Sequence, residues 1–94
     1  MTRVGAAGKK RAWRSEARAN DVALQPVLAA LGAKLVARRK SLGLTQEAIA
    51  SKASIDARHV QDLEYGRSNA TIATLRAVAI ALETTVAELL RDVC

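Results

Sequence analysis

The sequence is poor in aromatic residues, cysteine and histidine, and each shortage excludes a class of protein. With one Trp, one Tyr and no Phe among 94 residues, the core must be small and aliphatic. The single cysteine, Cys94, leaves no internal disulfide, and the single histidine, His59, leaves no cluster of thiolates and imidazoles for a metal ion. We therefore expect no metal or other cofactor, and a reducing compartment such as the cytoplasm.

Long apolar runs and catalytic motifs are also missing. The longest uninterrupted apolar run, Ala77 to Leu82, is far short of the roughly 20 residues that cross a bilayer. Basic residues, among them Lys9 and Lys10, stand where a signal peptide would place its apolar segment, so we expect a protein that stays inside the cell without a membrane partner. No glycine-rich phosphate loop or nucleophile with a paired base is present, which predicts that the protein is not an enzyme.

Hydrophobic residues and positive charge are what the chain does hold. Half of its residues are hydrophobic, with alanine prominent among them, which favours closely packed helices in one domain. The net charge is +6, and residues 1–26, with six basic and two acidic residues, carry most of it. We therefore predict an all-α domain at residues 27–94 that follows a basic, flexible arm at residues 1–26.

The positive charge by itself does not identify a partner. It suits nucleic-acid phosphates, anionic membranes or acidic proteins. For the arm, three roles stay open. The first is to lie in a minor groove or along DNA phosphates, the second is to bind a protein partner, and the third is to serve as a solvated tail.

Beyond Pro26, apolar residues recur at helical spacing between short polar breaks. This pattern predicts five helices, at about residues 27–41, 46–53, 57–65, 72–82 and 86–91. Gly43 can end the first helix in the left-handed conformation, and Gly66 ends the third. The residues expected to cap the last four helices are Thr45, Asp56, Thr71 and Thr85, the last in a capping box with Glu88.

The second and third expected helices, joined by a short turn, have the layout of a helix-turn-helix. The surrounding pattern is more specific than that layout: Leu31-Gly32, Leu35, Arg39, Gly43-Leu44-Thr45-Gln46, Ile49-Ala50, Lys52-Ala53, Val60, Leu63-Glu64-Tyr65-Gly66-Arg67, Thr71, Leu75 and Ala79 to Leu82. With these residues, the segment from Leu31 to Leu90 resembles the lambda-repressor-like (Cro-type, XRE) helix-turn-helix family. The resemblance implies a compact five-helix DNA-binding domain and a sequence-specific transcriptional regulator, either a repressor or an autoregulator.

Two positions depart from the family pattern. Ser54 stands in the turn where the family commonly has Gly, at a backbone position that is usually left-handed. A serine there should cost on the order of 1 kcal/mol if the conformation is kept. Ala70 stands where the family often has Pro before the fourth helix, which changes the expected loop but not the expected fold.

The outward face of the third helix is the predicted base-reading surface, because Val60 and Leu63 should face inward. Arg can pair with guanine, Gln with adenine, and Ala can contact a thymine methyl, whereas Asp either accepts from cytosine or holds Arg58 in place. The alternative is an ordinary solvated face. The residues predicted to contact bases are Asp56, Ala57, Arg58, Gln61 and Asp62.

A second group is predicted to contact DNA phosphates. In the family, the residue matching Gln46 holds a DNA phosphate at a helix start, where free N–H groups favour an anion, and this is the role expected for Gln46. The alternative is a plain polar residue at a helix start. His59 is either a phosphate or groove-edge contact or an exposed bystander, and Asn69 either grips a phosphate or stabilises its turn. The full set is Thr45, Gln46, His59, Arg67, Ser68 and Asn69.

Arg39 and Glu64 are expected to be structural. The resemblance implies a mostly buried ion pair between the first and third helices, and removing one partner of such a pair costs roughly 3–5 kcal/mol. Arg39→Ala should therefore lower thermal stability before it changes sequence preference.

The expected partner is double-stranded DNA, and the expected location is the nucleoid in the cytoplasm. Because one helix reads only a few base pairs, we expect a homodimer that binds a palindromic operator. Leu89, Leu90 and Val93 either form the dimer surface or pack inside the monomer. The sequence does not distinguish among three kinds of regulator: a phage-type repressor, a restriction-modification controller and an antitoxin that binds a toxin. The alternative class is a protein-interaction module, such as a toxin-binding antitoxin or a bridging coactivator, with nonspecific nucleic-acid binding.

Overall fold

The computed structural model describes residues 22–93, which contain five helices and no strand. The predicted all-α class is confirmed, and each predicted helix is present with ends no more than two residues away. Residues 1–21, most of the predicted arm, and Cys94 lie outside the described residues. The helices are α2 (Gln25–Ser41), α3 (Gln46–Ala53), α4 (Ala57–Glu64), α5 (Ile72–Ala81) and α6 (Val86–Leu90).

The largest difference from the predicted helices is at the start of α2, which begins at Gln25 rather than at about residue 27. Pro26 therefore lies inside the first turn instead of ahead of the helix. Proline is tolerated there because the first N–H groups of a helix have no intrahelical acceptor, so a missing N–H breaks no hydrogen bond.

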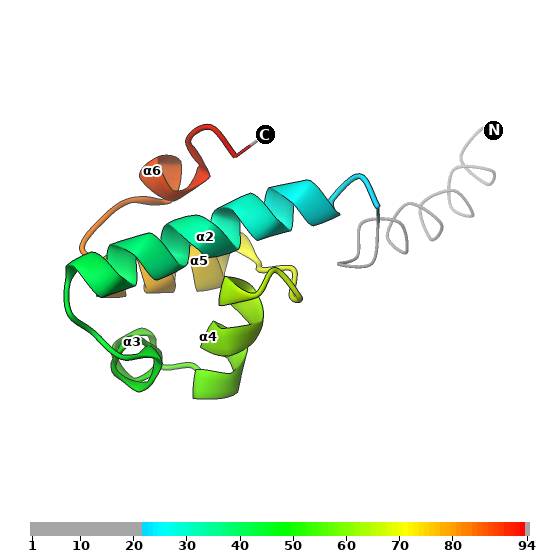
Figure 1. The fold of residues 1–94 in the computed structure, drawn as a ribbon. Coiled ribbons are helices and arrows are strands. Elements are labelled where there is room, and N and C mark those ends of the chain that lie inside the picture. The colour runs from blue at the N-terminus through cyan, green and yellow to red at the C-terminus, as the bar shows by residue number, and fades with distance from the viewer. Residues whose placement is uncertain (1–21, 94) are drawn as a thin grey trace, which may run out of the picture.

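Helix α2 runs through the middle of the molecule, with α6 on one side and the α3–α4 pair on the other (Figure 1). Helix α3 packs against α4 and α5, and α6 packs against α2 and α5. The helix-turn-helix pair therefore lies on the opposite side of α2 from the last helix.

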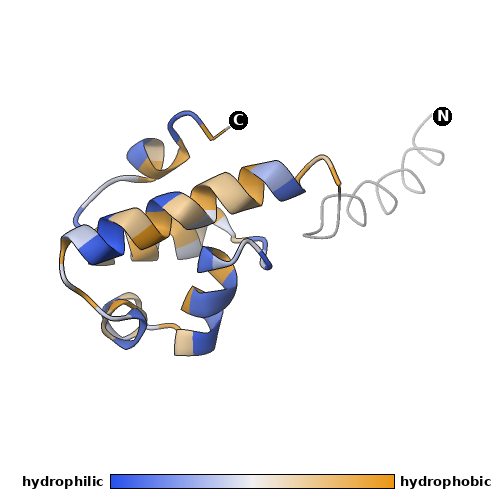
Figure 2. Cartoon of the chain, in the orientation of Figure 1, coloured by the Kyte–Doolittle hydropathy of each residue, from blue (hydrophilic) through white to orange (hydrophobic). Residues whose placement is uncertain are grey.

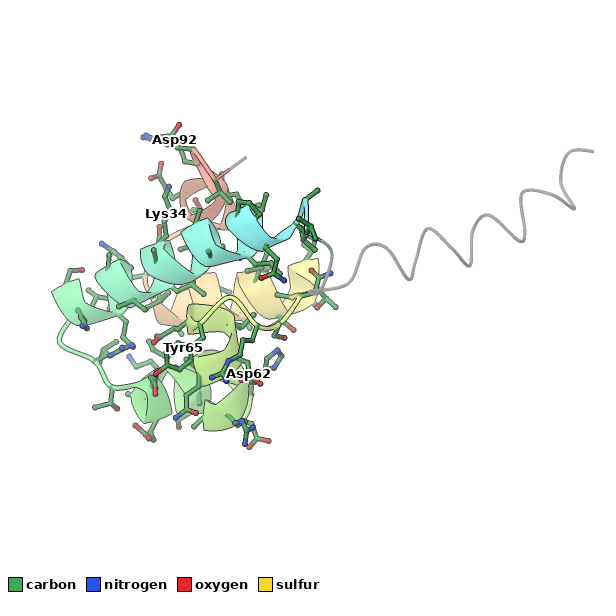
Figure 3. All side chains as sticks on the ribbon, turned by 45° about the vertical axis from the view of Figure 1, so that its right-hand side comes forward. Lys34, Asp62, Tyr65 and Asp92 are labelled. Carbon is green, nitrogen blue, oxygen red and sulfur yellow. The ribbon has the colours of Figure 1, made fainter. Side chains whose placement is uncertain are left out.

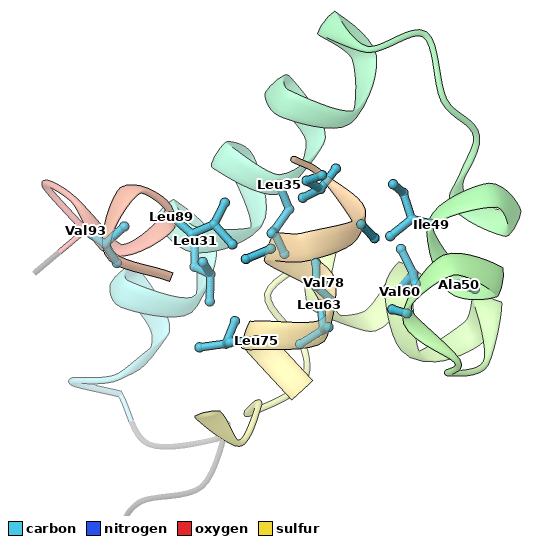
Figure 4. Close-up of a cluster of buried hydrophobic side chains, with 14 residues drawn as sticks. Leu31, Leu35, Ile49, Ala50, Val60, Leu63, Leu75, Val78, Leu89 and Val93 are labelled. Atoms are coloured by element: carbon cyan, nitrogen blue, oxygen red, sulfur yellow. The ribbon is translucent and has the colours of Figure 1, made fainter. Parts of the chain in front are cut away.

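The core between these helices is aliphatic, as the shortage of aromatic residues requires. Leu31 and Leu35 of α2 meet Ile49 of α3, Val60 of α4 and Val78 of α5 in one buried cluster (Figure 4). Burying each such side chain contributes about 1.5–3 kcal/mol. Among residues 22–93, no helix is long and apolar enough to cross a membrane.

The end of the chain contributes to the same core. Leu89 is 3% exposed and Val93 is 7% exposed, and both belong to the buried cluster (Figure 4). Of the two readings that the sequence leaves open for these residues, packing inside the monomer is confirmed. Leu90, which is half-buried, packs at the edge of the cluster.

Threonine side chains begin three of the helices, as predicted. The hydroxyl oxygens of Thr45, Thr71 and Thr85 each accept a hydrogen bond from the backbone N–H three residues later. The prediction for Asp56 is wrong, because its side chain makes no capping hydrogen bond. The N–H of His59, which a capping carboxylate would normally bind, donates instead to the backbone carbonyl of Asp56 at 3.0 Å.

Helix α2 approaches the end of α4 so closely that only glycine fits at the contact. A Cβ added to Gly32 would lie 2.3 Å from the carbonyl oxygen of Glu64. Close helix packing of this kind fixes the position of α4 relative to the longest helix of the domain.

Two cations of α2 bind the C-terminal ends of later helices. Arg38 donates through Nε to the carbonyl of Leu82 at 2.8 Å and through its guanidinium to the carbonyl of Glu83 at 2.9 Å. The ammonium of Lys34 donates to two carbonyls at the end of α6. Cations are favourable there because helix C-termini carry partial negative charge. Part of the positive charge outside the arm therefore stabilises the fold.

Candidate nucleic-acid interface

Helices α3 and α4 are joined by a tight turn that begins at Ser54. The backbone of Ser54 is left-handed, with φ 58° and ψ 44°, which is the conformation that the family usually gives to glycine. The turn therefore keeps the family geometry despite the serine, at a cost of about 1 kcal/mol. The pair is held from inside by the buried residues Ile49, Ala50, Ala53, Val60 and Leu63.

The outward face of α4 is polar and is not covered by the rest of the described chain. The helix is largely hydrophilic apart from Val60 and Leu63 (Figure 2). Arg58 keeps 80% of its side chain exposed, and Gln61 and Asp62 are half-buried. With Asp56 exposed just before the helix, the structure brings the predicted base-contact residues together on one face. Ala57 is the least free of them, because it also packs against the edge of the core.

Asp62 lies between two arginines on this face. Its Oδ1 is 3.9 Å from Nε of Arg58, one turn earlier, and 3.8 Å from Nε of Arg67, in the loop after α4. Exposed ion pairs of this length contribute little to stability, about 0–1 kcal/mol. Their effect is on orientation, because one carboxylate restrains two flexible guanidinium groups beside the same surface.

Tyr65 lies beside this cluster, although it is not among the contact residues predicted from the sequence. The residue is 68% exposed, and the guanidinium carbon of Arg67 lies 4.6 Å from the centre of the Tyr65 ring. Figure 3 shows Asp62 on α4 and Tyr65 at the end of that helix. The signal for Tyr65 is its position two residues after buried Leu63, which turns it away from the core. An exposed cation–π contact contributes about 0.5–1 kcal/mol.

The residues predicted to contact phosphates lie at three locations: the start of α3, helix α4 and the loop after α4. Thr45 and Gln46 are at the start of α3, while Arg67, Ser68 and Asn69 are in the loop after α4, and His59 is half-buried on α4. The hydroxyl of Thr45 accepts from the N–H of Ala48 and still has its own hydrogen to donate. Nε2 of Gln46 donates to Oε1 of Glu64 at 2.8 Å, which leaves the second amide hydrogen for another acceptor.

The carboxylate of Glu64 connects three helices. Nε of Arg39 lies 2.7 Å from Oε2 of Glu64, and only 14% and 5% of these two side chains are exposed. Arg39 also donates to the backbone carbonyl of Leu44, so α2 is connected to α4 and to the loop that precedes α3. The hydrogen bond to Glu64 raises the pKa of Arg39 above its usual value, and its stabilising effect is fully present at neutral pH. The Arg39–Glu64 pair expected from the sequence is thus present.

Comparison with known proteins agrees with this geometry. A helix-turn-helix family model matches residues 35–89, which is more than half of the chain. Among solved structures, the chain is similar to the restriction-modification controller protein C.AhdI from Aeromonas hydrophila, with 31% identity and a TM-score of 0.65 over 66% of this chain and 94% of that chain. It is also similar to the clp gene regulator ClgR from Corynebacterium glutamicum, with 30% identity and a TM-score of 0.68 over 71% of each chain. None of the curated proteins matches it.

The matched residues include the whole of α3 and α4 and the Arg39–Glu64 ion pair that supports them. The sequence resemblance is therefore confirmed by the family model and by the fold. The chain belongs to the lambda-repressor-like, XRE-type helix-turn-helix family and is a DNA-binding transcription regulator, not an enzyme.

Proposed function

We propose that α4 lies in the major groove of a palindromic operator, that α3 binds the adjacent phosphates, and that two copies of the chain act together as a repressor or autoregulator. The observation that carries the proposal is the uncovered polar face of α4, whose opposite side is fixed in the core. A major groove about 12 Å wide admits one helix, and a rigidly held helix presents its side chains in a defined order to the base edges.

Each residue of the face has a role that follows from its chemistry and exposure. Arg58, the most exposed, would donate two hydrogen bonds to a guanine, and Gln61 would pair with an adenine. Asp56 would accept from a cytosine amine, and the free part of Ala57 would contact a thymine methyl. Of the two roles open to Asp62, its position between the two arginines supports the orienting one.

The phosphate contacts would come from both sides of α4. At the start of α3, the unused hydrogens of Thr45 and Gln46 and the free N–H groups of the helix favour an anion. After α4, Arg67 is restrained by Tyr65 and Asp62 and would grip a phosphate together with Ser68 and Asn69. His59 would contact the groove edge. Such contacts position the protein on DNA without specifying sequence.

Dimeric binding follows from the small reach of one helix. A single α4 contacts only a few base pairs, whereas two copies would place two readers about 34–36 Å apart on one side of the duplex. Bound across a promoter, a dimer would exclude polymerase, which is repression. The similar structures support a regulatory role, since one is a restriction-modification controller and another a clp gene regulator.

Selection of bound DNA from a random pool tests this proposal. We expect a motif with two-fold symmetry, and Arg58→Ala or Gln61→Ala should each lower affinity for that motif by about 5- to 150-fold, because one good base contact contributes roughly 1–3 kcal/mol of discrimination. Affinity for unrelated DNA should change far less.

The matched control is Arg91→Ala, which removes an exposed cation from the end of α6, on the other side of α2. It should lower affinity equally little for the selected motif and for unrelated DNA. Recovery of unpatterned DNA, or equal effects of the Arg58 and Arg91 changes on both kinds of DNA, would contradict base reading by α4 and favour nonspecific binding.

A further inference from the structure

A hollow lies between α2 and α6, on the side of α2 away from the α3–α4 pair (Figure 1). Its volume is about 340 Å³, which is at the lower end of the range for sites that hold small molecules. The hollow is open to solvent, so a small ligand can enter it without a movement of the helices. Its lining residues, from α2, the loop after α5 and α6, are Lys34, Ala37, Arg38, Thr84, Glu88 and Leu89.

Two cations, one helical turn apart on α2, form one wall of this hollow. They are Lys34 and Arg38, and Figure 3 shows Lys34 on the side of α2 that faces α6. Both are held at the wall by hydrogen bonds to backbone carbonyls at the C-terminal ends of α5 and α6. A cation that is already held in place loses little side-chain entropy when it binds an anion. The wall is therefore organised for a negatively charged group before any ligand arrives.

The same wall keeps hydrogen-bond donors that the fold does not use. Arg38 donates through two of its guanidinium N–H groups, and the others are left for a further acceptor. The ammonium of Lys34 donates to two carbonyls and also keeps a further hydrogen. Within residues 22–93, the hydroxyl of Thr84 has no hydrogen-bond partner. A carboxylate or phosphate in the hollow would accept from these groups.

Positive charge exceeds negative charge around the hollow. Glu88 is the one acidic residue of the lining, and its Oε2 lies 3.7 Å from Nη2 of Arg91, outside the hollow. Its charge is therefore partly balanced by Arg91. Within the described part of the chain, neither Lys34 nor Arg38 has an acidic partner. The charges of the lining thus favour an anion over a neutral molecule or a cation.

The remaining surface of the hollow is mostly apolar. Leu89 is 3% exposed and belongs to the core, and Ala37 adds a methyl group from α2. We propose that the hollow binds a small organic anion, namely a short aliphatic chain that ends in a carboxylate or a phosphate. The anionic group accepts from Lys34, Arg38 and Thr84. The aliphatic part packs against Ala37 and Leu89.

This site is separate from the polar face of α4, and the proposal does not rest on base reading. It uses none of the residues assigned to bases or phosphates, and α2 lies between the two surfaces (Figure 1). One chain can therefore hold the ligand and DNA at the same time.

A titration of the full chain with isovalerate, followed by amide chemical shifts, tests the site. We expect saturable shifts centred on Ala37, Thr84 and Leu89, with the amides of α4 unmoved. Isovaleramide, the neutral compound of the same shape, should bind at least about 10-fold more weakly, because hydrogen bonds to a charged group are stronger. A parallel titration with isobutyl phosphate distinguishes the two anionic groups, since the preferred one binds more tightly.

Ala37→Leu tests the position of the ligand, because the larger side chain fills the hollow from α2. It should weaken isovalerate binding by at least about 10-fold. The melting temperature should not fall, because residue 37 is exposed and leucine is a good helix former. The matched control is Ala33→Leu, at an exposed position one turn earlier on α2 and outside the hollow, which should bind isovalerate like the natural chain.

Arg38→Met tests the charge. It keeps an aliphatic side chain and removes the guanidinium, so isovalerate should bind at least about 10-fold more weakly while isovaleramide changes little. Lys40→Met removes an exposed cation of α2 outside the hollow and should change neither. The proposal is overturned if neither isovalerate nor isobutyl phosphate gives saturable shifts, if Ala37→Leu binds isovalerate like the natural chain, or if the Arg38 and Lys40 changes have equal effects.

Discussion

Helices α4 and α5 are both short, and both pack against α3, but their outward sides differ completely. The outer side of α4 carries Arg58, Gln61 and Asp62, whereas α5 has one charged residue and exposes Ile80. Polar side chains in fixed positions suit base edges and phosphates, whereas an exposed apolar side chain does not.

The inward sides of α4 and α5, in contrast, are alike. Val60 of α4 and Val78 of α5 belong to the same buried cluster, so the two helices share one core. A change to that core or to the Arg39–Glu64 ion pair should disturb the outward sides of both helices, because it destabilises the whole domain. A change to one outward side should leave the other unchanged. Variants ordered by the size of their expected effect test this separation.

The largest effect is expected from the ion pair that connects α2 with α4. Arg39→Ala leaves the carboxylate of Glu64, of which 5% is exposed, without its guanidinium, so the free energy of unfolding should fall by about 3–5 kcal/mol. Chemical denaturation measures the fall. Both DNA binding and self-association should be lost at temperatures where the variant unfolds.

The control for this prediction is Arg39→Met combined with Glu64→Gln, which removes both charges from the buried pair. It should recover part of the lost stability, because no uncompensated charge stays buried. An Arg39→Ala variant with the melting temperature of the natural chain would show that the pair does not support the domain.

The helices and the inward residues could be predicted from the sequence, because burial imposes helical periodicity and because Thr caps and Gly43 mark the helix ends. Thr45, Thr71 and Thr85 cap as expected, and Ser54 keeps the left-handed conformation. The sequence predicts a side-chain cap at Asp56, and this prediction is wrong, because residue type does not show that the backbone carbonyl of Asp56 accepts from the N–H of His59.

The outward surfaces were harder to predict, because no packing rule acts on exposed side chains. The ring contact of Tyr65 with Arg67 and the position of Asp62 between two arginines depend on where the loop after α4 returns. The exposure of Ile80 was also hidden, since an apolar residue on an apolar helix is normally assigned to the core.

A smaller effect is expected at the turn that α4 shares with α3. Ser54→Gly should raise the free energy of unfolding by about 0.5–1 kcal/mol, because glycine adopts φ 58° without steric cost. Ser51→Gly, inside α3, is the matched control and should lower stability by a few tenths to about 1 kcal/mol, as helix propensity requires. Thermal melting distinguishes them, and destabilisation by Ser54→Gly would mean that the serine side chain holds the turn.

The smallest effect is expected from the exposed aromatic ring at the end of α4. Tyr65→Ala removes the ring beneath the Arg67 guanidinium, so affinity for DNA should fall by about two- to five-fold, corresponding to a cation–π contact of roughly 0.5–1 kcal/mol. The fall should be equal for the selected motif and unrelated DNA, because Arg67 is assigned to a phosphate, and the dimer dissociation constant should not change. Tyr65→Phe keeps the ring and should bind DNA like the natural chain. If Tyr65→Phe weakens binding as much as Tyr65→Ala, the hydroxyl rather than the ring contacts DNA, and the role of Tyr65 is direct binding rather than positioning of Arg67.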